Sequence, residues 1–507
     1  MKALISVYDK TGVIEFARSL QKVGMDLVST GGTYQALKDA GLKVQQVSDL
    51  TGFPEILGGR VKTLHPVVYG GILARRDQDD HIAQLSSLNM DRIDLVAVNL
   101  YPFAATIARP DVTLEDALEN IDIGGPTMLR AAAKNFPFVS VVVDPSDYSW
   151  VAEGLIAGDL DLEHRRKLAQ KAFQHVAYYD TMISRYLEGS GDKFGEYITL
   201  GYEKLYDLRY GENPHQEAAF YKEAMSSIGV AGSTQLHGKE LSYNNILDAD
   251  AAWRAVSDFF EPAAAVIKHT NACGLAVHED QAQAYQMAFD GDPISAFGGI
   301  VAFNREVTLE TAQAMRQIFY EIVLAPAFNS DALEILKKKK DLRILELGNG
   351  NGVGTRDLEV RQVLGGLLAQ TPDKLDEEPE NWQVVTEHKP TEQQWSDLVF
   401  AWKAVKHIKS NAIVVVKGNK LLGMGAGQPN RITSVNLALK AAGKEAHGSI
   451  LASDAFFPFA DGVEAAAEGG IGVLVQPGGS IRDSEVIDAA NRLGVAMVFT
   501  GVRHFRH

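Results

Sequence analysis

The chain has 507 residues, more than one hydrophobic core usually organises, so we expect two or three domains. Its 65 acidic and 49 basic side chains give a formal net charge of -16, which argues against a general affinity for nucleic acid or anionic membranes. The single cysteine, Cys273, excludes an intramolecular disulfide framework and a metal site built from several thiolates, and it favours a reducing, cytoplasmic setting.

The first third of the chain alternates short β-type runs with helical patterns. It opens without the apolar core of a signal peptide, and no later stretch reaches the roughly 18 apolar residues of a membrane span, so we expect a soluble, unprocessed protein. Strands are predicted at residues 2–7, 26–30, 43–47, 94–103 and 138–143, and helices at 11–24 and 33–41. Strands separated by helices predict a parallel α/β sheet, in which ligands usually bind beyond the carboxyl ends of the strands.

Two breaks divide the rest of the chain. A helical pattern over residues 161–187 is followed by the Gly-rich, charged stretch EGSGDKFGE, which we interpret as the main domain boundary, near residue 195. A second, acidic break at residues 371–382 divides the region 196–507. Both parts of that region contain an apolar strand that leads into a polar cluster, which indicates two similar α/β subdomains.

Three loops of the first domain place glycines and hydroxyls at predicted strand ends, and two of them add cations. VSTGGT (28–33) places two glycines between a strand and a helix, where backbone N–H groups and the helix dipole can hold a phosphate. Such turns also occur for geometry alone, and this alternative stays open for any single loop. YDKTG (8–12) and GGRVKTLHP (58–66) each add a lysine and a threonine, and three such loops in one domain favour a phosphorylated substrate.

The same domain carries a phenol, a carboxylate and a further lysine. Tyr101 follows an apolar strand, Asp122 precedes a Gly-Gly break that opens a helix, and Lys134 lies three turns along that helix. Aromatic packing, a helix cap and a surface charge are the respective alternatives. Around a phosphate pocket, these groups would suit proton transfer in a ring closure or a dehydration.

The second region places KHTNACG, residues 268–274, directly after an apolar strand. Lys268 and His269 predict a catalytic edge that moves a group between two substrates, and a buried structural histidine is the alternative. The segment RYGENPHQ (209–216) forms a polar turn with several functional side chains. Further candidates are Asn245 at a predicted helix start, Phe297 and Gly298 beside a second glycine, and Asn411, Arg431, Asp461 and His507 toward the carboxyl end.

Two other motifs have simpler interpretations. LRILELGNGNGVG is similar to the strand and glycine loop with which methyltransferases bind a nucleoside cofactor. The following TRDLEVRQVLGGLL predicts another strand instead of a crossover helix, which favours a hairpin or a mobile loop. The run Lys337–Lys340 ends a predicted helix, where cations complement the helix dipole, so we expect a solvated helix end.

A series of motifs, in order from the first residues to the last, resembles the bifunctional AICAR transformylase/IMP cyclohydrolase family of purine biosynthesis. They are DKTG, STGGT, GGRVKTLHP, NLYPF, IDIGG with LRAAAKN, RYGENPHQ, KHTNACG, GAGQPNR and SDAFFPF. The resemblance implies an amino-terminal domain similar to methylglyoxal synthase, which closes the purine ring of FAICAR to give IMP. It also implies a carboxyl-terminal region of two cytidine-deaminase-like α/β subdomains, which transfers a formyl group from 10-formyltetrahydrofolate to AICAR.

The resemblance also bears on metals and partners. Zinc chemistry of the deaminase type is not implied, because a single cysteine cannot supply that ligand set. The family forms a homodimer that builds the transformylase site across the subunit interface, and a bound monovalent ion is compatible with it. No nucleic acid or membrane partner is expected.

Individual residues are assigned by the same resemblance. For ring closure it implies catalytic Lys62, Tyr101, Asp122 and Lys134, with substrate contacts from Lys10, Thr11, Gly31, Gly32, Arg60 and Thr63. For formyl transfer it implies catalytic Lys268, His269 and Asn411, with substrate contacts from Arg209, Tyr210, His215, Arg431, Asp461, Phe505 and His507. Two positions depart from the family: Tyr8 stands where relatives often have Ser, and Ala272 where Pro is common. With Tyr8, the first loop lacks the serine hydroxyl that would contact the phosphate. With Ala272, the catalytic turn lacks a rigid proline.

The chemistry explains why such residue types are needed. The aromatic amine of AICAR is a poor nucleophile, so His269 would take its proton as the amine attacks the formyl carbon. Lys268 and Asn411 would favour the charge that develops on the tetrahedral oxygen. Two rival functions stay open. A regulatory ligand-binding module would show no turnover, and a methyltransferase would bind S-adenosylmethionine.

Overall fold

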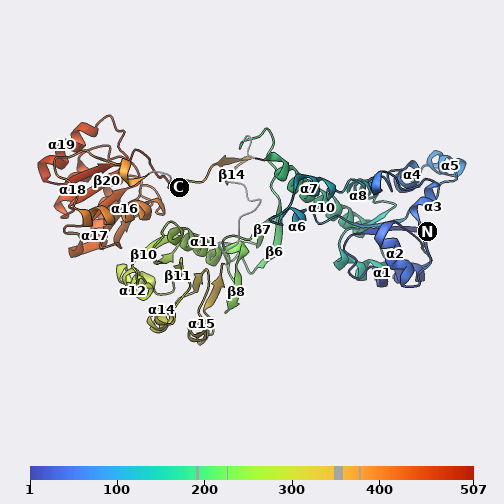
Figure 1. Cartoon of the computed structure of the whole chain (residues 1–507), viewed down its shortest axis with the longest axis horizontal. Helices are drawn as coiled ribbons and strands as arrows, with labels where there is room; N and C mark the ends of the chain where they lie inside the picture. The colour runs from blue at the N-terminus through green and yellow to red at the C-terminus, as the bar shows by residue number, and fades with distance from the viewer. Residues whose placement is uncertain (190–192, 225, 348–357, 376–377) are drawn as a thin grey trace. The chain divides into compact units, whose positions relative to one another are not determined.

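The computed structural model describes residues 1–189, 193–224, 226–347, 358–375 and 378–507. The chain divides into two compact units, Met1–Tyr202 and Glu203–His507, called unit 1 and unit 2 below (Figure 1). The boundary predicted near residue 195 precedes this division and follows the long helix α10 (Leu162–Glu188). Each unit has its own sheet, so each is described by itself.

Unit 1 is built on a five-stranded sheet with the order β3-β2-β1-β4-β5. The strands are β1 (Lys2–Val7), β2 (Asp26–Ser29), β3 (Val44–Gln46), β4 (Leu95–Asn99) and β5 (Ser140–Val142). All neighbouring pairs are parallel, as the alternation of strands and helices predicted. The strands are apolar because helices cover both faces: residues 3–5 of β1 and residues 95–97 of β4 have no exposed surface.

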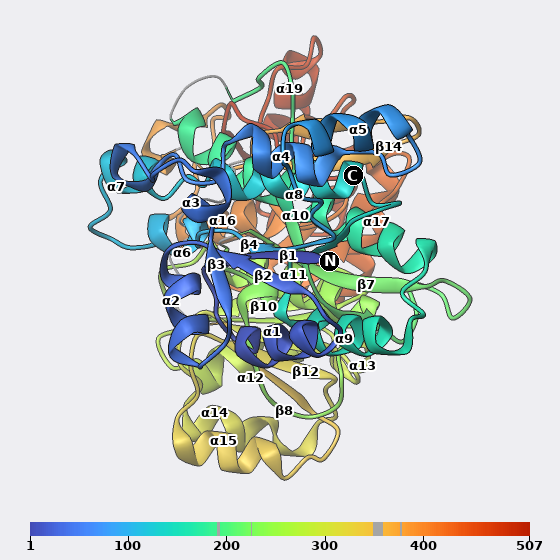
Figure 2. The same cartoon turned by 90° about the vertical axis from the view of Figure 1, so that its right-hand side faces the viewer.

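The helices of unit 1 follow from this strand order. Its helices are α1 (Val13–Lys22), α2 (Gly31–Asp39), α3 (Val47–Thr51), α4 (Pro66–Leu73), α5 (Asp79–Ser87), α6 (Phe103–Ile107), α7 (Leu114–Glu119), α8 (Gly124–Lys134), α9 (Tyr148–Ala157) and α10. From β1 the chain moves to β2 on one side and later to β4 on the other, so right-handed crossovers put α1 and α8 on opposite faces. Figure 2 shows α1 below the strands and α4 and α8 above them. The order reverses between β1 and β4, which is where such sheets bind ligands.

Unit 2 contains a mixed sheet with the order β16-β21-β20-β19-β17-β18-β10-β9-β11-β12-β13-β8. The first half comprises β8 (Thr234–His237), β9 (Ala263–Lys268), β10 (Asn271–Val277), β11 (Ile300–Phe303), β12 (Ile322–Ala325) and β13 (Arg343–Glu346). The second half comprises β16 (Gln383–Val384), β17 (Ile413–Lys417), β18 (Lys420–Gly425), β19 (Ile450–Ser453), β20 (Val473–Gln476) and β21 (Ala496–Phe499). The halves meet where β10 pairs with β18 in antiparallel fashion.

The two halves repeat one order of elements. The first runs from α11 (Tyr243–Ser257) through the β9–β10 hairpin and α12 (Gln281–Gly291) to parallel β11, β12 and β13, with α14 (Leu309–Ala314) and α15 (Ser330–Lys337) between them. The second runs from α16 (Glu392–Lys406) through the β17–β18 hairpin and α17 (Arg431–Ala442) to parallel β19, β20 and β21, with α18 (Asp461–Glu468) and α19 (Asp483–Leu493). This repetition agrees with the prediction of two similar α/β subdomains, and the predicted break at 371–382 lies between β15 (Gly366–Gln370) and β16.

Three apolar cores hold unit 2 together. Helices α11 and α16 share one core on the same face of the sheet, which includes Ala252, Trp402 and the inward residues of both hairpins. On the other face, α12, α14 and α15 form the second core and α17, α18 and α19 the third. Figure 1 shows α12, α14 and α15 on the side of β11 opposite to α11. The shared core is therefore what joins the two repeats.

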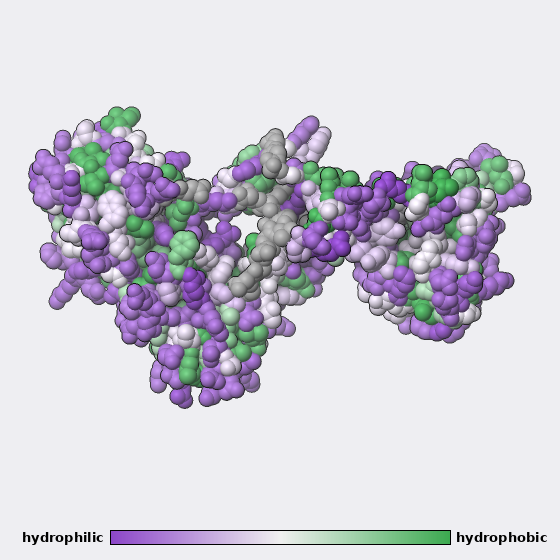
Figure 3. Space-filling model, viewed as in Figure 1, coloured by the Kyte–Doolittle hydropathy of each residue, from purple (hydrophilic) through white to green (hydrophobic). Residues whose placement is uncertain are grey.

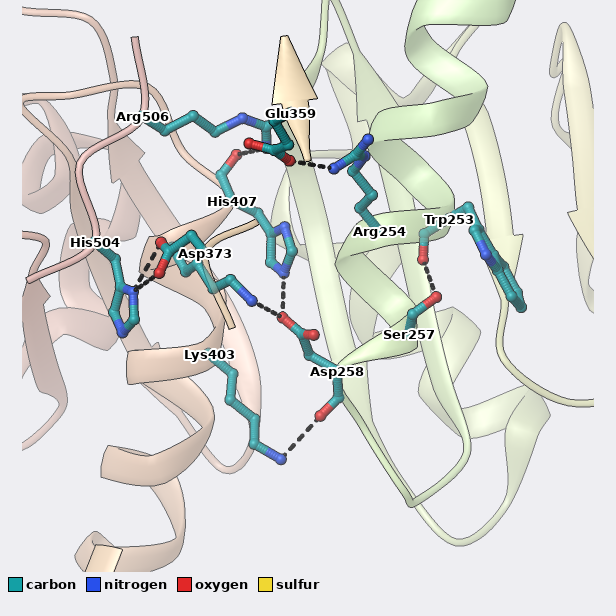
Figure 4. A network of polar contacts seen from close by, with 11 residues as sticks. Trp253, Arg254, Ser257, Asp258, Glu359, Asp373, Lys403, His407, His504 and Arg506 are labelled. Atoms are coloured by element: carbon teal, nitrogen blue, oxygen red, sulfur yellow. Dashed lines mark hydrogen bonds and ion pairs between the residues drawn. The ribbon is translucent and has the colours of Figure 1, made fainter. Parts of the chain in front are cut away.

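A polar network adds to this junction (Figure 4). The carboxylate of Asp258, at the end of α11, lies 2.7 Å from His407 Nε2 and accepts a hydrogen bond of 3.1 Å from Lys406 Nζ. Arg506, in the carboxyl-terminal tail, donates to the His407 carbonyl over 3.0 Å. Burial lowers the pKa of His407, and although burial alone would raise the pKa of Asp258, hydrogen bonds from His407 and Lys406 hold it below its usual range. The network ties the first repeat to α16 and to the tail.

The structure also locates the start of the glycine-rich motif LRILELGNGNGVG and the lysine run 337–340. The predicted strand before the glycine loop is β13, and residues 348–357 of that loop lie outside the described residues. The stretch predicted as one further strand forms two, β14 (Glu359–Val363) and β15, paired as an antiparallel hairpin. The lysine run ends α15 as predicted, but Lys339 is not a solvated charge: its Nζ donates to the carbonyl of Met315 over 2.9 Å.

The surface is consistent with the acidic composition. Hydrophilic residues cover most of the visible face of each unit in Figure 3, and hydrophobic residues form separate patches. Within the described ranges, we find no helix that is both long and apolar enough to cross a bilayer. The short strands β6 (Tyr202–Leu208) and β7 (Ala218–Glu223) pair with each other and belong to neither large sheet.

Candidate active sites

The first candidate site lies at the carboxyl edge of β1, β2 and β4. Because these strands are parallel neighbours, the loops that follow them, residues 8–12, 30–32 and 100–102, meet at one edge. Asn99, at the end of β4, fixes the first loop: its Oδ1 accepts from the backbone N–H groups of Tyr8 (2.6 Å) and Asp9 (3.0 Å). Its Nδ2 donates to the Asp9 carbonyl over 2.9 Å. Sequence reasoning did not assign Asn99 a role, although it begins the motif NLYPF.

Two lysines stand over the glycine loop at the start of α2. A Cβ atom built on Gly32 would lie 3.7 Å from Lys10 Nζ, and one built on Gly31 would lie 3.8 Å from Lys62 Nζ. Gly31 has φ +55°, a left-handed conformation that favours glycine. The loop leads into the amino terminus of α2, where unpaired N–H groups and the helix dipole favour an anion. These positive groups form the local cationic pocket that an acidic protein needs to bind an anionic substrate.

The cations of the loop at residues 58–66 are paired with carboxylates in this structure. Lys62 Nζ lies 3.1 Å from Glu55, and Arg60 forms an ion pair with Glu119. Thr63 Oγ1 lies 3.0 Å from the position of a Cβ atom on Gly124, so this loop reaches the start of α8. An anionic substrate would compete with these exposed carboxylates for the two cations, and exposed pairs of this kind contribute little stability.

Asp122 lies in the same region, directly before α8. Its Oδ1 accepts from the Gly125 N–H over 2.8 Å, and its own N–H donates to the hydroxyl of Tyr179 over 2.9 Å. Burial raises the pKa of Asp122, and the N–H groups of Gly125, Gly124 and Tyr101 together with the Lys62 charge offset part of this effect. A carboxylate with a raised pKa beside a lysine is suited to accepting a proton.

The other predicted residues of this site divide into two groups. Tyr101 is 40% exposed and meets the ring of Tyr8 edge-on at 5.9 Å, and Thr11 Oγ1 donates to Asp9 over 2.7 Å, so both lie at the loop edge.

Lys134 does not join Tyr101 and Thr11 at this edge. It ends α8, ten residues beyond Gly124, which corresponds to about 15 Å along the helix axis. There it lines a cavity of about 700 Å³ together with Tyr69, Arg130 and Arg166.

The second candidate site lies at one edge of the central strands of unit 2. Strands β9 and β18 end there, and β10 and β17 begin there, because β10 runs antiparallel to both β9 and β18 and β17 antiparallel to β18. This arrangement brings the turn after Lys268 and the residues before β17, including Asn411, to the same edge. The site therefore draws on both repeats.

Lys268 and His269 occupy the end of the β9–β10 hairpin. Lys268 Nζ donates to the carbonyl of Phe297 over 2.9 Å, which places Phe297 and Gly298 beside the hairpin. The ring of Phe297 is 62% exposed and packs against Phe319 at 5.4 Å. His269 is exposed at the tip of the turn. The alternative of a buried structural histidine is therefore wrong.

Asn411 is held by a buried ion pair. Arg431, which is 7% exposed, pairs with the fully buried carboxylate of Asp454, and its Nη2 donates to Asn411 Oδ1 over 2.8 Å. Asn411 Nδ2 donates to the Gln428 carbonyl over 2.9 Å. Arg431 was predicted to contact substrate, and in this structure its guanidinium is largely enclosed and donates to Asn411. Asp454 was missed as a partner, although it lies in the motif SDAFFPF.

The carboxyl-terminal tail lies next to Asn411. Ser410 donates its N–H to the Arg506 carbonyl over 2.8 Å, and the Arg506 N–H donates to Ser410 Oγ over 3.1 Å. The tail carries Phe505 and His507, whose rings are 5.6 Å apart. Phe505 is 39% exposed, and the guanidinium of Arg503 lies over its ring, 4.7 Å from the ring centre.

The remaining predicted residues lie in the turn at residues 209–216 and at the starts of two helices. The guanidinium of Arg209 lies 5.9 Å from the ring of Tyr210, and His215 is exposed in the following turn. Asp461 begins α18 and is exposed. Asn245 takes part in a capping box at the start of α11, where its Oδ1 accepts from the Ser242 N–H over 3.1 Å.

The chain matches two family models and relatives of full length. A model described as AICARFT/IMPCHase bienzyme matches residues 132–441, and one described as MGS-like domain matches residues 12–127. The bifunctional purine biosynthesis protein PurH of Bacillus cereus is 53% identical over 509 residues, which cover 100% of this chain and 99% of that protein. The PurH protein of Bacillus anthracis matches to the same extent. A solved structure titled Crystal structure of ForH is 39% identical, covers 36% of this chain and 96% of that chain, and has a TM-score of 0.32.

Proposed function

The chain belongs to the family of AICARFT/IMPCHase bienzymes, and we propose which of its side chains perform the two reactions. It is a bifunctional enzyme of purine biosynthesis. In the first reaction the formyl group of 10-formyltetrahydrofolate passes to the amine of AICAR, giving FAICAR and tetrahydrofolate. In the second, FAICAR closes to IMP with loss of water. The observation that carries the proposal is that two separate clusters, one in each unit, hold the groups these reactions need.

Ring closure is assigned to unit 1. Lys10 and the glycines at the start of α2, Gly31 and Gly32, bind the phosphate, with Arg60, Thr11 and Thr63 at the rim. Asp122 takes a proton from the carboxamide nitrogen as that nitrogen attacks the formyl carbon. Lys62 favours the charge that develops on the formyl oxygen, which then takes up the proton that Asp122 accepted. Tyr101 supplies the second proton as that oxygen leaves as water, and the former formamide nitrogen gives up its N–H proton, which restores Tyr101, as the ring C=N bond forms. Burial raises the pKa of Asp122, which suits it to accepting a proton, and hydrogen bonds from neighbouring N–H groups and the Lys62 charge offset part of this effect.

Lys134 remains in the proposal with a smaller part. The resemblance assigns it to the catalytic group, while its position at the far end of α8 separates it from Asp122. We propose that it acts on the substrate from a distance, or from a second chain, and that Lys134→Ala therefore impairs ring closure less than Lys62→Ala does.

Formyl transfer is assigned to unit 2. His269 takes the proton of the AICAR amine as the amine attacks the formyl carbon of the folate. Lys268 and the second hydrogen of Asn411 Nδ2 donate to the tetrahedral oxygen, and the leaving folate nitrogen takes up a proton. Arg209, Tyr210, His215 and Asn245 are proposed to contact the nucleotide, and Phe297, Gly298, Arg431, Asp461, Phe505 and His507 to shape the shared nucleotide and folate site.

The cosubstrate of the first reaction is 10-formyltetrahydrofolate. We propose no catalytic metal, and we allow a bound monovalent ion an accessory role. A cytoplasmic location is proposed because the one cysteine is unpaired and buried.

The assignment predicts that the amino-terminal part works alone. A fragment of residues 1 to about 195 should fold and convert supplied FAICAR to IMP, because its sheet and all the loops of the first site are complete. Measuring IMP formation by the purified fragment tests this. A folded fragment that binds a purine mononucleotide but makes no IMP would contradict the partition and favour a regulatory module.

We also propose a homodimer. The resemblance implies a transformylase site built across a subunit interface, and the candidate residues are spread over both repeats of unit 2. Sedimentation velocity at assay concentration should show a dimer. Full formyl transfer by a species that sediments as a monomer would refute this.

A further inference from the structure

In each repeat of unit 2, an aspartate on a helix binds the backbone of a hairpin turn, and we call this contact the hairpin device. Asp248 is the sixth residue of α11 and Asp397 the sixth residue of α16. The carboxylate of Asp248 accepts from the backbone N–H groups of His269 (3.2 Å) and Thr270 (2.6 Å) in the β9–β10 turn. The carboxylate of Asp397 accepts from the N–H groups of Gly418 (2.9 Å) and Asn419 (2.8 Å) in the β17–β18 turn. In both repeats a helix thus holds a two-residue turn through one aspartate.

The two turns differ in the residues they contain. All four turn residues have positive φ, +62° and +54° for Gly418 and Asn419, and +53° and +61° for His269 and Thr270. Glycine and asparagine adopt this left-handed conformation readily and are typical of such hairpins. Histidine does so less often, and threonine rarely, because its branched Cβ crowds the backbone. One turn therefore carries ordinary turn residues, and the other carries a histidine, which adopts the conformation less often than glycine or asparagine, and a threonine, which resists it.

Strained residues persist where the surroundings impose them, and they gather at functional sites. The strained copy is the one that carries His269. Building on the proposed function, in which His269 accepts a proton, we propose that Asp248 is a positioning residue for formyl transfer. It holds the His269–Thr270 turn left-handed and so sets the direction of the His269 imidazole. Asn271 supports the same turn, since its Nδ2 donates to the His269 carbonyl over 2.9 Å.

The geometry also predicts how well other residues at positions 248 and 270 can keep the turn in place. Each of the two Asp248 oxygens accepts one N–H group, so a carboxylate matches both donors, while the amide of asparagine offers a single acceptor oxygen. Asp248→Asn should therefore retain part of the hold on the turn, and Asp248→Ala none. Replacing Thr270 by glycine removes the residue that resists the conformation most, so the turn should then need less support from α11.

The test compares kcat and KM for formyl transfer across full-length variants, with ring closure and melting temperature measured on each. We expect Asp248→Ala to lower kcat at least tenfold, because a small misplacement of a reacting group costs that much or more, while KM for AICAR changes little. Asp248→Asn should fall in between. Thr270→Gly alone should stay near the wild-type rate, and Asp248→Ala/Thr270→Gly should recover most of the lost kcat.

Asp397→Asn is the matched control, because it weakens the same device at a turn whose residues need no help. It should leave formyl transfer within about twofold of wild type, whereas Asp248→Asn should not. Wild-type kcat in Asp248→Ala would overturn the proposal. So would a loss that Thr270→Gly does not restore and that Asp397→Asn reproduces with an equal fall in melting temperature. His269→Ala distinguishes a failure of the proposed function from a failure of this inference. If His269→Ala transfers formyl normally, His269 is not the proton acceptor. If His269→Ala is impaired and Asp248→Ala is normal, only the positioning role of Asp248 is wrong.

Discussion

Replacing His269 by alanine should lower formyl transfer by roughly a hundredfold or more, the usual scale for losing a positioned acid-base group. The side chain is exposed at the tip of the β9–β10 hairpin, so its removal leaves no cavity in a core. The melting temperature should therefore change little. Ring closure of supplied FAICAR should stay near the wild-type rate, because Lys62, Tyr101 and Asp122 belong to unit 1.

His278 provides the matched control for this experiment. It is an exposed histidine directly after the other end of β10, and its ring accepts from the Asp280 N–H over 3.0 Å. His278→Ala should transfer formyl at the wild-type rate. If His269→Ala and His278→Ala behave alike, the imidazole at the hairpin tip has no special part in the reaction.

Replacing Asp122 by asparagine should lower ring closure by a similar factor and leave tetrahydrofolate release intact. The amide keeps the hydrogen bond that the Gly125 N–H donates, so the start of α8 should hold its shape while the proton acceptor is lost. Steady-state assay of IMP formation from FAICAR measures the loss. Asp26→Asn, an exposed change at the opposite edge of the same sheet, should have no effect on either reaction.

The pH profile gives this prediction a second readout. Burial raises the pKa of Asp122 above its usual value of 3.8, and only the deprotonated form can accept a proton. Ring closure should therefore decline as pH falls through a value above the ordinary range of aspartate. In Asp122→Asn this acid limb should vanish from the residual rate, and its persistence would assign the titration to another group.

Much of unit 1 could be predicted from the sequence because its strands are short, buried runs separated by amphipathic helices. Once a parallel sheet is expected, the meeting of the loops after β1, β2 and β4 follows from topology. The position of Lys134, three turns along a predicted helix that begins after Asp122, could also be predicted from the sequence. The family resemblance groups it with Asp122, whereas twelve residues that run mostly along one continuous helix separate the two side chains.

Unit 2 shows where sequence patterns stop being informative. The polar cluster at 268–274 and the candidate Asn411 are visible in the sequence, but nothing local says that one edge of a sheet unites them, because this depends on the β10–β18 pairing between repeats. The polar motif GAGQPNR favours a substrate-binding cation at Arg431, and its burial against Asp454 is a tertiary effect. Asp248 had no signal at all, because its role depends on the register between α11 and a turn about twenty residues later.

The central claim is that two independent sites, one in each unit, carry the two reactions. It is tested most directly by supplying AICAR and 10-formyltetrahydrofolate and following tetrahydrofolate and IMP together in His269→Ala, Asp122→Asn and their equimolar mixture. We predict that Asp122→Asn releases tetrahydrofolate without making IMP, that His269→Ala makes neither yet converts added FAICAR, and that the mixture makes IMP. A His269→Ala protein that cannot convert added FAICAR, or an Asp122→Asn protein that releases no tetrahydrofolate, would contradict the claim.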